Sequence, residues 1–303
     1  MSLILENVSK SFGNKKVVDN ISLKLDKPTI FGLLGTNGAG KTTTIRMLLG
    51  IIKKDKGIIT WKEHNIDRKS VNFGYLPEER GIYPKTKIME QLIYFAKLKG
   101  MNEEEAIQSI NYWAKELKVE EYMNMFAEQL SKGNQQKIQF MISVIHNPDL
   151  IVLDEPFSGL DPVNTDILKK VIVNLVKKGK YIIMSAHEMH TIEEFCSDII
   201  ILNRGKTVLQ GNLKDIRNSY QANRIVIEAN QSIDEFIDGL EIENEHDNNY
   251  IIKINEEEEG FKLLNKLVKN NIKITKFEMM KPTLNDIFIE KVGATNEWFN
   301  YGY

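Results

Sequence analysis

The sequence predicts an α/β fold with a substantial parallel sheet, followed by a smaller α+β domain. Three observations lead to this prediction. Over roughly the first two hundred residues, β-branched strand candidates alternate with amphipathic helical segments. Several of these strand candidates are continuously apolar, as strands buried on both faces of a parallel sheet should be. After about residue 215, the chain changes to shorter segments that alternate between strand and helix.

The strand candidates of the first part begin at residues 3, 16, 29, 71, 150, 181 and 198, and they read LILENV, KVVDNISLKL, TIFGLLG, VNFGYL, LIVLD, YIIMSA and DIIILN. Between the fourth and the fifth of them there is no strand signal. Instead, KIMEQLIYFAKLKG, EEEAIQSINYWAKELK and the segment after LSKGNQQ carry apolar residues at helical spacing. We therefore expect a first domain over residues 1–214, with a helical insertion at about residues 86–147.

Residues 215–303 are expected to form a separate accessory domain. RIVIEA, YIIKIN and IKITKFEMM read as strands, and IDEFIDGL and EEEEGFKLLNKLVKNN read as helices. A short strand near EIEN would complete a ferredoxin-like β-α-β-β-α-β unit. A last helix is expected after Pro282.

The composition is that of an ordinary folded chain. The 303 residues are 42% hydrophobic and 27% charged, which suggests one large or two modest domains. No apolar run approaches the roughly 18 residues that cross a bilayer, so we expect a cytoplasmic protein. Cys196 is the only cysteine, which excludes an intrachain disulfide. Residues 1–214 hold 30 basic and 25 acidic side chains without a clustered basic face, so no nucleic-acid partner is expected.

Residues 35–42, GTNGAGKT, match the phosphate-binding pattern G-x-x-x-x-G-K-[ST] and lie between a predicted strand and a predicted helix, the context that the motif requires. Its glycines let the backbone wrap around phosphates, the Lys41 ammonium reaches the β and γ oxygens, and the Thr42 hydroxyl ligates Mg²⁺. The chain is therefore expected to bind a nucleoside triphosphate. The expected binding residues are Gly35, Thr36, Asn37, Gly38, Ala39, Gly40, Lys41, Thr42 and Thr43.

Acidic side chains follow the buried strand LIVLD. Asp154 can take Mg²⁺ directly or through water. Glu155 can orient or deprotonate a water that attacks the γ-phosphate. Without the phosphate motif, two acids at a strand end would indicate only the start of a loop. His187 stands at the tip of YIIMSAH, where we expect it at the same sheet edge and in contact with the γ-phosphate.

A second phosphate-type feature occurs at LSKGNQQ, residues 130–136. A small hydroxyl residue followed by glycine at the start of a helix leaves several N–H groups without partners, which suits an anion. One chain would thus hold two such features.

In this order the motifs resemble the ATP-binding subunit of an ABC transporter, over residues 1 to about 215. GTNGAGKTT resembles Walker A, LIVLDEP resembles Walker B with its catalytic glutamate, and LSKGNQQ resembles the LSGGQ signature. SGLDP at 158–162 resembles the D-loop, and His187 resembles the H-loop histidine. Phe12 stands where the family places an aromatic that stacks on adenine, although plain packing would also explain it.

The resemblance implies a P-loop NTPase fold and Mg²⁺-dependent ATP hydrolysis. It also implies that two subunits, either identical or close paralogues, stack head to tail around ATP. Each signature would then face the nucleotide of the other chain. An integral membrane permease is the second implied partner, and it would hold the subunit on the inner face of the cell membrane. The implied contacts from the signature and the D-loop are Ser131, Gly133, Asn134 and Asp161.

This sequence departs from the family pattern at several motif positions. Lys132 and Asn134 replace a glycine and the glutamine of the signature. Glu78 stands at the position of the Q-loop glutamine, where it keeps an oxygen for Mg²⁺ but adds a charge. Thr36 replaces a frequent proline of Walker A, which should matter little.

YLPEERGIYP, LSKGNQQK and the C-terminal PTLNDIFIEKV are similar to the NatA-type subgroup of bacterial exporter ATPases. The subgroup includes sodium-efflux and drug- or peptide-resistance systems, and the cargo is not fixed by these motifs. The alternative is a soluble ABC ATPase of the translation or DNA-repair type. Those types usually carry two cassettes or long coiled-coil insertions, and this chain has neither.

Overall fold

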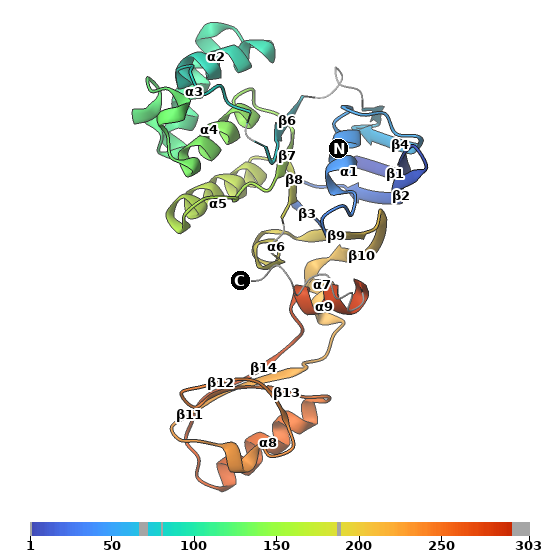
Figure 1. The fold of residues 1–303 in the computed structure, drawn as a ribbon, viewed down its shortest axis with the longest axis vertical. Coiled ribbons are helices and arrows are strands. Elements are labelled where there is room, and N and C mark those ends of the chain that lie inside the picture. The colour runs from blue at the N-terminus through green and yellow to red at the C-terminus, as the bar shows by residue number, and fades with distance from the viewer. Residues whose placement is uncertain (1, 67–71, 80, 187–188, 293–303) are drawn as a thin grey trace. The chain divides into compact units, whose positions relative to one another are not determined.

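The computed structural model describes residues 2–66, 72–79, 81–186 and 189–292. The chain divides into two compact units, Met1–Gly211 and Asn212–Tyr303 (Figure 1). Each unit has a hydrophobic core of its own and is described by itself.

A six-stranded sheet with the order β10-β9-β3-β8-β7-β6 forms the centre of the first unit. β3 pairs in parallel with β8 and β9, and β7 pairs in parallel with β6 and β8, so the predicted parallel sheet is confirmed. Every residue of β3, β7 and β8 is buried, which explains their unbroken apolar sequences. The strands are β3 (Ile30–Gly35), β6 (Phe73–Leu76), β7 (Leu150–Asp154), β8 (Tyr181–Ser185), β9 (Asp198–Asn203) and β10 (Lys206–Asn212).

The first two predicted strands lie outside this sheet. β1 (Leu3–Phe12) and β2 (Lys15–Leu25) form a second, antiparallel sheet with β4 (Lys56–Trp61) and β5 (His64–Asn65), in the order β2-β1-β4-β5. The alternating burial along β2 is typical of a strand with one face in the core. The sequence pattern did not indicate β4, β5 or β10. The first three residues of β4 are exposed, β5 has two exposed residues, and β10 has no fully buried residue, so none shows the apolar pattern of a core strand.

Helices connect the strands of the central sheet. α1 (Lys41–Leu48) follows β3, and α5 (Pro162–Lys177) and α6 (Met189–Phe195) flank β8 in the sequence. The expected helical insertion contains α2 (Ile88–Leu98), α3 (Glu103–Leu117) and α4 (Lys132–Val144), with the 3₁₀ turns Glu120–Tyr122 and Ala127–Gln129. Within the ranges that the structure describes, no helix is both long and apolar enough to cross a membrane.

α4 lies directly against β6. A Cβ added at Gly74 would stand 1.9 Å from the backbone oxygen of Ser143, so only glycine allows this approach. Ser109 on α3 donates a hydrogen bond of 2.6 Å to the carbonyl oxygen of Ile145, just beyond α4. The C-terminal half of α4 is therefore fixed on the sheet.

The second unit contains a four-stranded sheet in the order β12-β13-β11-β14, and each neighbouring pair in it is antiparallel. This is the strand order of a ferredoxin-like unit, in which the two inner strands are the first and the third. Its core includes Ile225, Ile227, Tyr250 and Leu267. The elements are α7 (Leu213–Asn218), β11 (Arg224–Ala229), β12 (Glu241–His246), β13 (Asn249–Lys253), α8 (Glu257–Lys269), β14 (Ile274–Met280) and α9 (Leu284–Val292).

The prediction of a helix at IDEFIDGL in this unit is wrong. IDEFIDGL forms only a 3₁₀ turn over Asp234–Phe236. The Ser232 hydroxyl accepts a hydrogen bond from the Asp234 N–H at 3.2 Å, which favours a turn over a helix. Gly239, with φ of 81°, then turns the chain into β12.

Arg224 holds α9 on this sheet. Its guanidinium donates to both carboxylate oxygens of Asp286, at 2.7 and 3.1 Å. The same guanidinium donates to Glu243 on β12. One arginine thus joins three elements of the unit.

Candidate nucleotide-binding site

The loop between β3 and α1 depends on glycine at two positions. Gly35 has φ of 148°, and a Cβ there would stand 2.4 Å from the carbonyl oxygen of Leu202. Gly40 has φ of 101°, and a Cβ there would stand 2.7 Å from the carbonyl oxygen of Val17. Gly40 is also the N-cap of α1, whose first N–H groups have no partners within the helix. These N–H groups and the dipole of α1 suit a phosphate.

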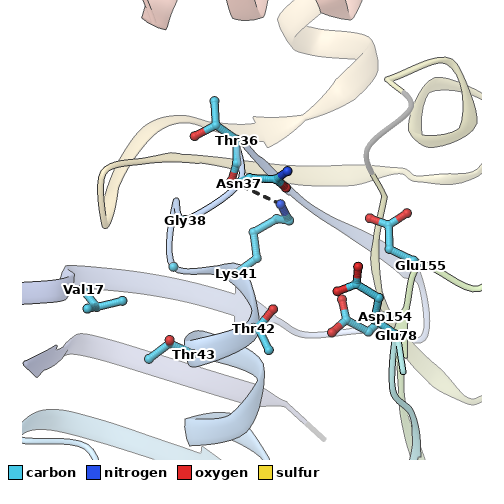
Figure 2. A pocket seen from close by; sticks show the side chains of 11 residues that line it. Val17, Thr36, Asn37, Gly38, Lys41, Thr42, Thr43, Glu78, Asp154 and Glu155 are labelled. Atoms are coloured by element: carbon cyan, nitrogen blue, oxygen red, sulfur yellow. Dashed lines mark hydrogen bonds between the residues drawn. The ribbon is translucent and has the colours of Figure 1, made fainter. Parts of the chain in front are cut away.

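Lys41 turns back onto this loop. Its Nζ donates a hydrogen bond to the carbonyl oxygen of Gly35 at 2.7 Å. It donates another to that of Thr36 at 3.3 Å (Figure 2). Burial lowers the pKa of Lys41, and the charges of Glu155, Asp154 and Glu78 oppose that effect. The ammonium is therefore held beside three carboxylates.

A pocket of about 140 Å³ opens between the loop and these carboxylates. Asp154 ends β7, Glu155 follows it, and Glu78 lies in the segment after β6. Figure 2 shows the three acids on one side of the pocket and the residues of the loop and α1 on the other. The pocket is lined by Val17, Thr36, Asn37, Gly38, Gly40, Lys41, Thr42, Thr43, Glu78, Asp154 and Glu155.

Glu155 occupies an unusual backbone conformation. Its φ is 52°, in the left-handed region that residues other than glycine adopt rarely. Its N–H donates to the Ser185 hydroxyl at 3.2 Å and to the Ser185 carbonyl oxygen at 3.3 Å. The Ser185 hydroxyl in turn donates to Asp154 Oδ1. Ser185 thus holds both residues, because β7 and β8 place it opposite Asp154.

The donor set of the pocket fits a hard divalent cation such as Mg²⁺. Thr42, Glu78 and Asp154 all offer oxygen atoms, and all line the pocket. Burial and then the charge of Asp154 raise the pKa of Tyr75, on the neighbouring β6, to about 12. In the described part of the chain, no group of three or more His, Cys, Asp and Glu residues is arranged to hold a metal ion. Mg²⁺ usually takes one or two carboxylates and completes its shell with phosphate oxygens and water.

Signature and D-loop residues form a second cluster, which does not line this pocket. Ser131 is the N-cap of α4, and its hydroxyl accepts a hydrogen bond from the Asn134 N–H at 3.3 Å. A Cβ at Gly133 would stand 3.4 Å from the Leu160 side chain, so the two motifs are adjacent. Asp161 is the N-cap of α5, and its hydrogen bond from the Asn164 N–H holds its pKa below the usual value. The two helix N-termini therefore lie next to each other, outside the lining of the first pocket.

The other site residues predicted from the sequence either do not line this pocket or lie outside the described residues. Phe12 is about half exposed at the end of β1, with Lys10 Nζ 5.4 Å from its ring centre. Gly35 and Ala39 shape the loop without lining the pocket, and Ala39 is buried in the core. His187 lies outside the described residues. Ser185 was not predicted as a site residue, although its position two residues before His187 at the end of a buried strand was a usable signal.

Known ATP-binding proteins are similar to this chain in sequence and in fold. A family profile described as ABC transporter matches residues 18–158, and one described as the C-terminal domain of DrrA1-3-like ATP-binding proteins matches residues 211–292. The uncharacterized ABC transporter ATP-binding protein YhaQ of Bacillus subtilis is 44% identical, over 97% of this chain and 100% of its own. The ABC transporter ATP-binding protein NatA of the same organism is 32% identical, over 72% and 92%. A solved ATP-binding subunit of an ABC transporter covers 72% of this chain and 93% of its own, with a TM-score of 0.67 and 28% identity.

Proposed function

The chain belongs to the ABC transporter ATP-binding proteins, which are ATPases coupled to transport, and we propose that it powers a bacterial exporter. One observation carries the ATP-hydrolysing part of this proposal. Lys41 and the N-terminus of α1 face Asp154, Glu155 and Glu78 across a single pocket. That is the arrangement needed to bind a triphosphate and direct a water to its terminal phosphate.

Each residue of the pocket has a role in this proposal. The first N–H groups of α1 and the Lys41 ammonium bind the β and γ phosphates. Mg²⁺, held by Thr42, Asp154 and Glu78, would neutralise phosphate charge when bound. Glu155 orients the attacking water and accepts its proton. His187 would contact the γ-phosphate, and Phe12 would stack on adenine.

The second cluster supports a dimer around ATP. Ser131, Gly133, Asn134 and Asp161 lie together at the N-termini of two helices and away from the first pocket. A partner chain stacked head to tail would bring its nucleotide to these N–H groups. The partner would be a second copy or a close paralogue.

The transport partner is proposed to be a separate integral membrane permease, which would hold the chain on the cytoplasmic face of the membrane. The similarity of the Glu78 segment, the signature and the C-terminal segment to the NatA-type subgroup supports export. Residues 215–303 are proposed to be an accessory domain separate from nucleotide chemistry. A soluble non-transport ATPase is not favoured, because the chain aligns over 97% of its length with an ABC transporter ATP-binding protein.

Glu155→Gln in the purified full chain tests the proposed function. We expect turnover to fall by about 10²–10⁴, the usual range for a positioned general base. ATP binding should persist, and ATP-dependent dimers should accumulate on a sizing column. Near-normal turnover in this variant would show that Glu155 does not activate the water, and a wild-type chain that binds no ATP would refute the whole proposal.

A further inference from the structure

α4 contacts both loops that carry the acidic residues of the pocket. Gln136 and Gln139 lie on its inner side, and each is 3% exposed. They stand between Ser131, the N-cap of the helix, and Ser143, where the helix packs on Gly74 of β6. A movement at the N-terminus of α4 would therefore displace these glutamines, whereas the C-terminal half of the helix is fixed on the sheet.

Gln139 hydrogen-bonds to the residues immediately before and after Glu78. Its Nε2 donates to the carbonyl oxygen of Glu79 at 2.9 Å and to that of Pro77 at 3.3 Å. Two carbonyl acceptors fix the amide orientation, because a side-chain oxygen in that place would repel both. Gln139 Oε1 is buried and has no hydrogen-bond partner among the described residues. A buried unpaired acceptor lowers stability, so this amide serves the loop at some expense to the fold.

Gln136 holds the loop of Glu155 in the same way. Its Nε2 donates to the carbonyl oxygen of Pro156 at 3.2 Å and to that of Glu155 at 3.5 Å. The Glu155 N–H is already fixed by Ser185. The backbone of Glu155 is thus hydrogen-bonded through its N–H to Ser185 of β8 and through its carbonyl oxygen to Gln136 of α4.

We propose that Gln139 and Gln136 are positioning residues that tie Glu78 and Glu155 to α4, so that a nucleotide engaged by Ser131 aligns both acids at the chain's own nucleotide. This inference rests on the proposed function, in which Ser131 faces the ATP of the partner chain. In this proposal, α4 has two roles. Its N-terminus contacts one ATP, and its glutamines set the carboxylates that act on the other.

A purely structural role for the glutamines would predict something different. Removing them would lower stability, but the response of each loop to nucleotide would remain. Gln91 on α2 supplies a matched control. It is equally buried, and its Nε2 donates to the carbonyl oxygens of Tyr83 at 2.9 Å and Thr86 at 2.8 Å, which lie later in the β6–α2 segment than residues 77–79.

Amide hydrogen exchange of the full chain, measured by mass spectrometry, tests the proposal. Each protein is compared with and without Mg²⁺ and the β,γ-imido analogue of ATP, which is not hydrolysed. In the wild type we expect the analogue to slow exchange in residues 36–43 and in both acidic loops, residues 77–79 and 155–158. Ser131→Arg should keep the protection of residues 36–43 and lose it in both loops.

Each glutamine variant should change the hydrogen exchange of one loop and leave that of the other unchanged. Gln139→Met should lose the protection of residues 77–79 alone, Gln136→Met that of residues 155–158 alone, and Gln91→Met should lose neither. Turnover by Gln139→Met should fall by about 10- to 100-fold, since misplaced catalytic groups have effects of that size. Its KM for ATP should change far less, because the phosphate-binding loop is intact. If Gln139→Met does not fold, Gln139→Asn withdraws the amide by one methylene and keeps the polarity.

Three results would overturn the inference. They are loop protection that survives in Gln139→Met and Gln136→Met, loop protection that survives in Ser131→Arg, and an equal loss in Gln91→Met. Failure of the proposed function would look different. The wild type itself would then show no protection of residues 36–43 by the analogue.

Discussion

The Ser185 hydroxyl donates a hydrogen bond to Asp154 Oδ1 where β8 and β7 end side by side, and it accepts one from the Glu155 N–H at 3.2 Å. Ser185 is completely buried, so no solvent molecule can easily replace its hydroxyl. A single side chain therefore fixes the proposed metal ligand and the backbone of the proposed general base.

Ser185→Ala should lower turnover by about 10- to 100-fold, because both acids lose a fixed position. It should also cost about 1.5–3 kcal/mol of unfolding free energy, the range for a hydrogen bond to a charged group. Steady-state ATPase assays and urea denaturation measure the two effects. Ser143→Ala is the matched control, because Ser143 is also buried but its hydroxyl donates to Phe140 at 2.7 Å within α4. Equal turnover in the two variants would refute the role of Ser185.

Mixing two inactive variants should restore activity if the second cluster acts on the partner's nucleotide. Lys41→Ala removes the charge that binds the β and γ phosphates, and Ser131→Arg blocks the start of α4. In a mixed dimer, the intact loop of the Ser131→Arg chain meets the intact signature of the Lys41→Ala chain.

ATP turnover and ATP-dependent dimers should therefore both be measured for each variant alone and for an equal mixture. We expect the mixture to exceed the separate variants in at least one of the two. If it exceeds them in neither, Ser131 does not act on the partner's nucleotide.

Gly74→Ala should destabilise the first unit strongly. The new Cβ would stand 1.9 Å from the Ser143 carbonyl oxygen, so α4 and β6 would have to separate. Overpacking of this kind costs about 3 kcal/mol or more when backbone must move. Thermal denaturation measures the loss. Gly81→Ala should be nearly neutral, because no atom lies within 4 Å of a Cβ there. A small effect of Gly74→Ala would contradict the tight contact.

Asp286 should make the second unit sensitive to acid. Desolvation raises the pKa of Asp286, but hydrogen bonds from Arg224 and Thr283 outweigh this and hold the pKa below its usual value of 3.8. A carboxyl with a lowered pKa contributes stability that is present above pH 3.8 and is lost as the pH falls through the folded-state value.

Asp286→Asn should therefore cost about 1 kcal/mol near neutral pH, a discounted value for a partly exposed ion pair. The difference from the wild type should shrink below pH 3.8. Urea denaturation of both proteins from pH 6 to pH 3 measures this. A difference that stays constant over that range would show that the charge of Asp286 contributes nothing.

The sequence was sufficient where function depends on local pattern. GTNGAGKT between a strand and a helix located the loop at Lys41, and an apolar strand before Asp154 placed the acids at the sheet edge. The α/β class followed from strands that are buried on both faces. These features need only neighbours in the sequence.

What the sequence did not predict depends on packing between distant residues. Gln139 meets Glu79 across 60 positions, and Ser185 meets Asp154 across 31. No periodicity in α4 distinguishes Gln139 from a glutamine on a solvated face. The turn at IDEFIDGL was read as a helix because its apolar spacing fits one, whereas local hydrogen bonding at Ser232 decided the outcome.

The backbone conformation of Glu155 lowers the stability of the fold at the position of the proposed general base. A φ of 52° would suit glycine, and a side chain there carries a conformational penalty of the order of 1–3 kcal/mol. A glycine in its place would relax the turn but remove the carboxylate. The position of the proposed general base is therefore also one where greater stability and greater activity call for different residues. A search for more stable variants that ignored turnover would be drawn to this residue and would remove the proposed general base.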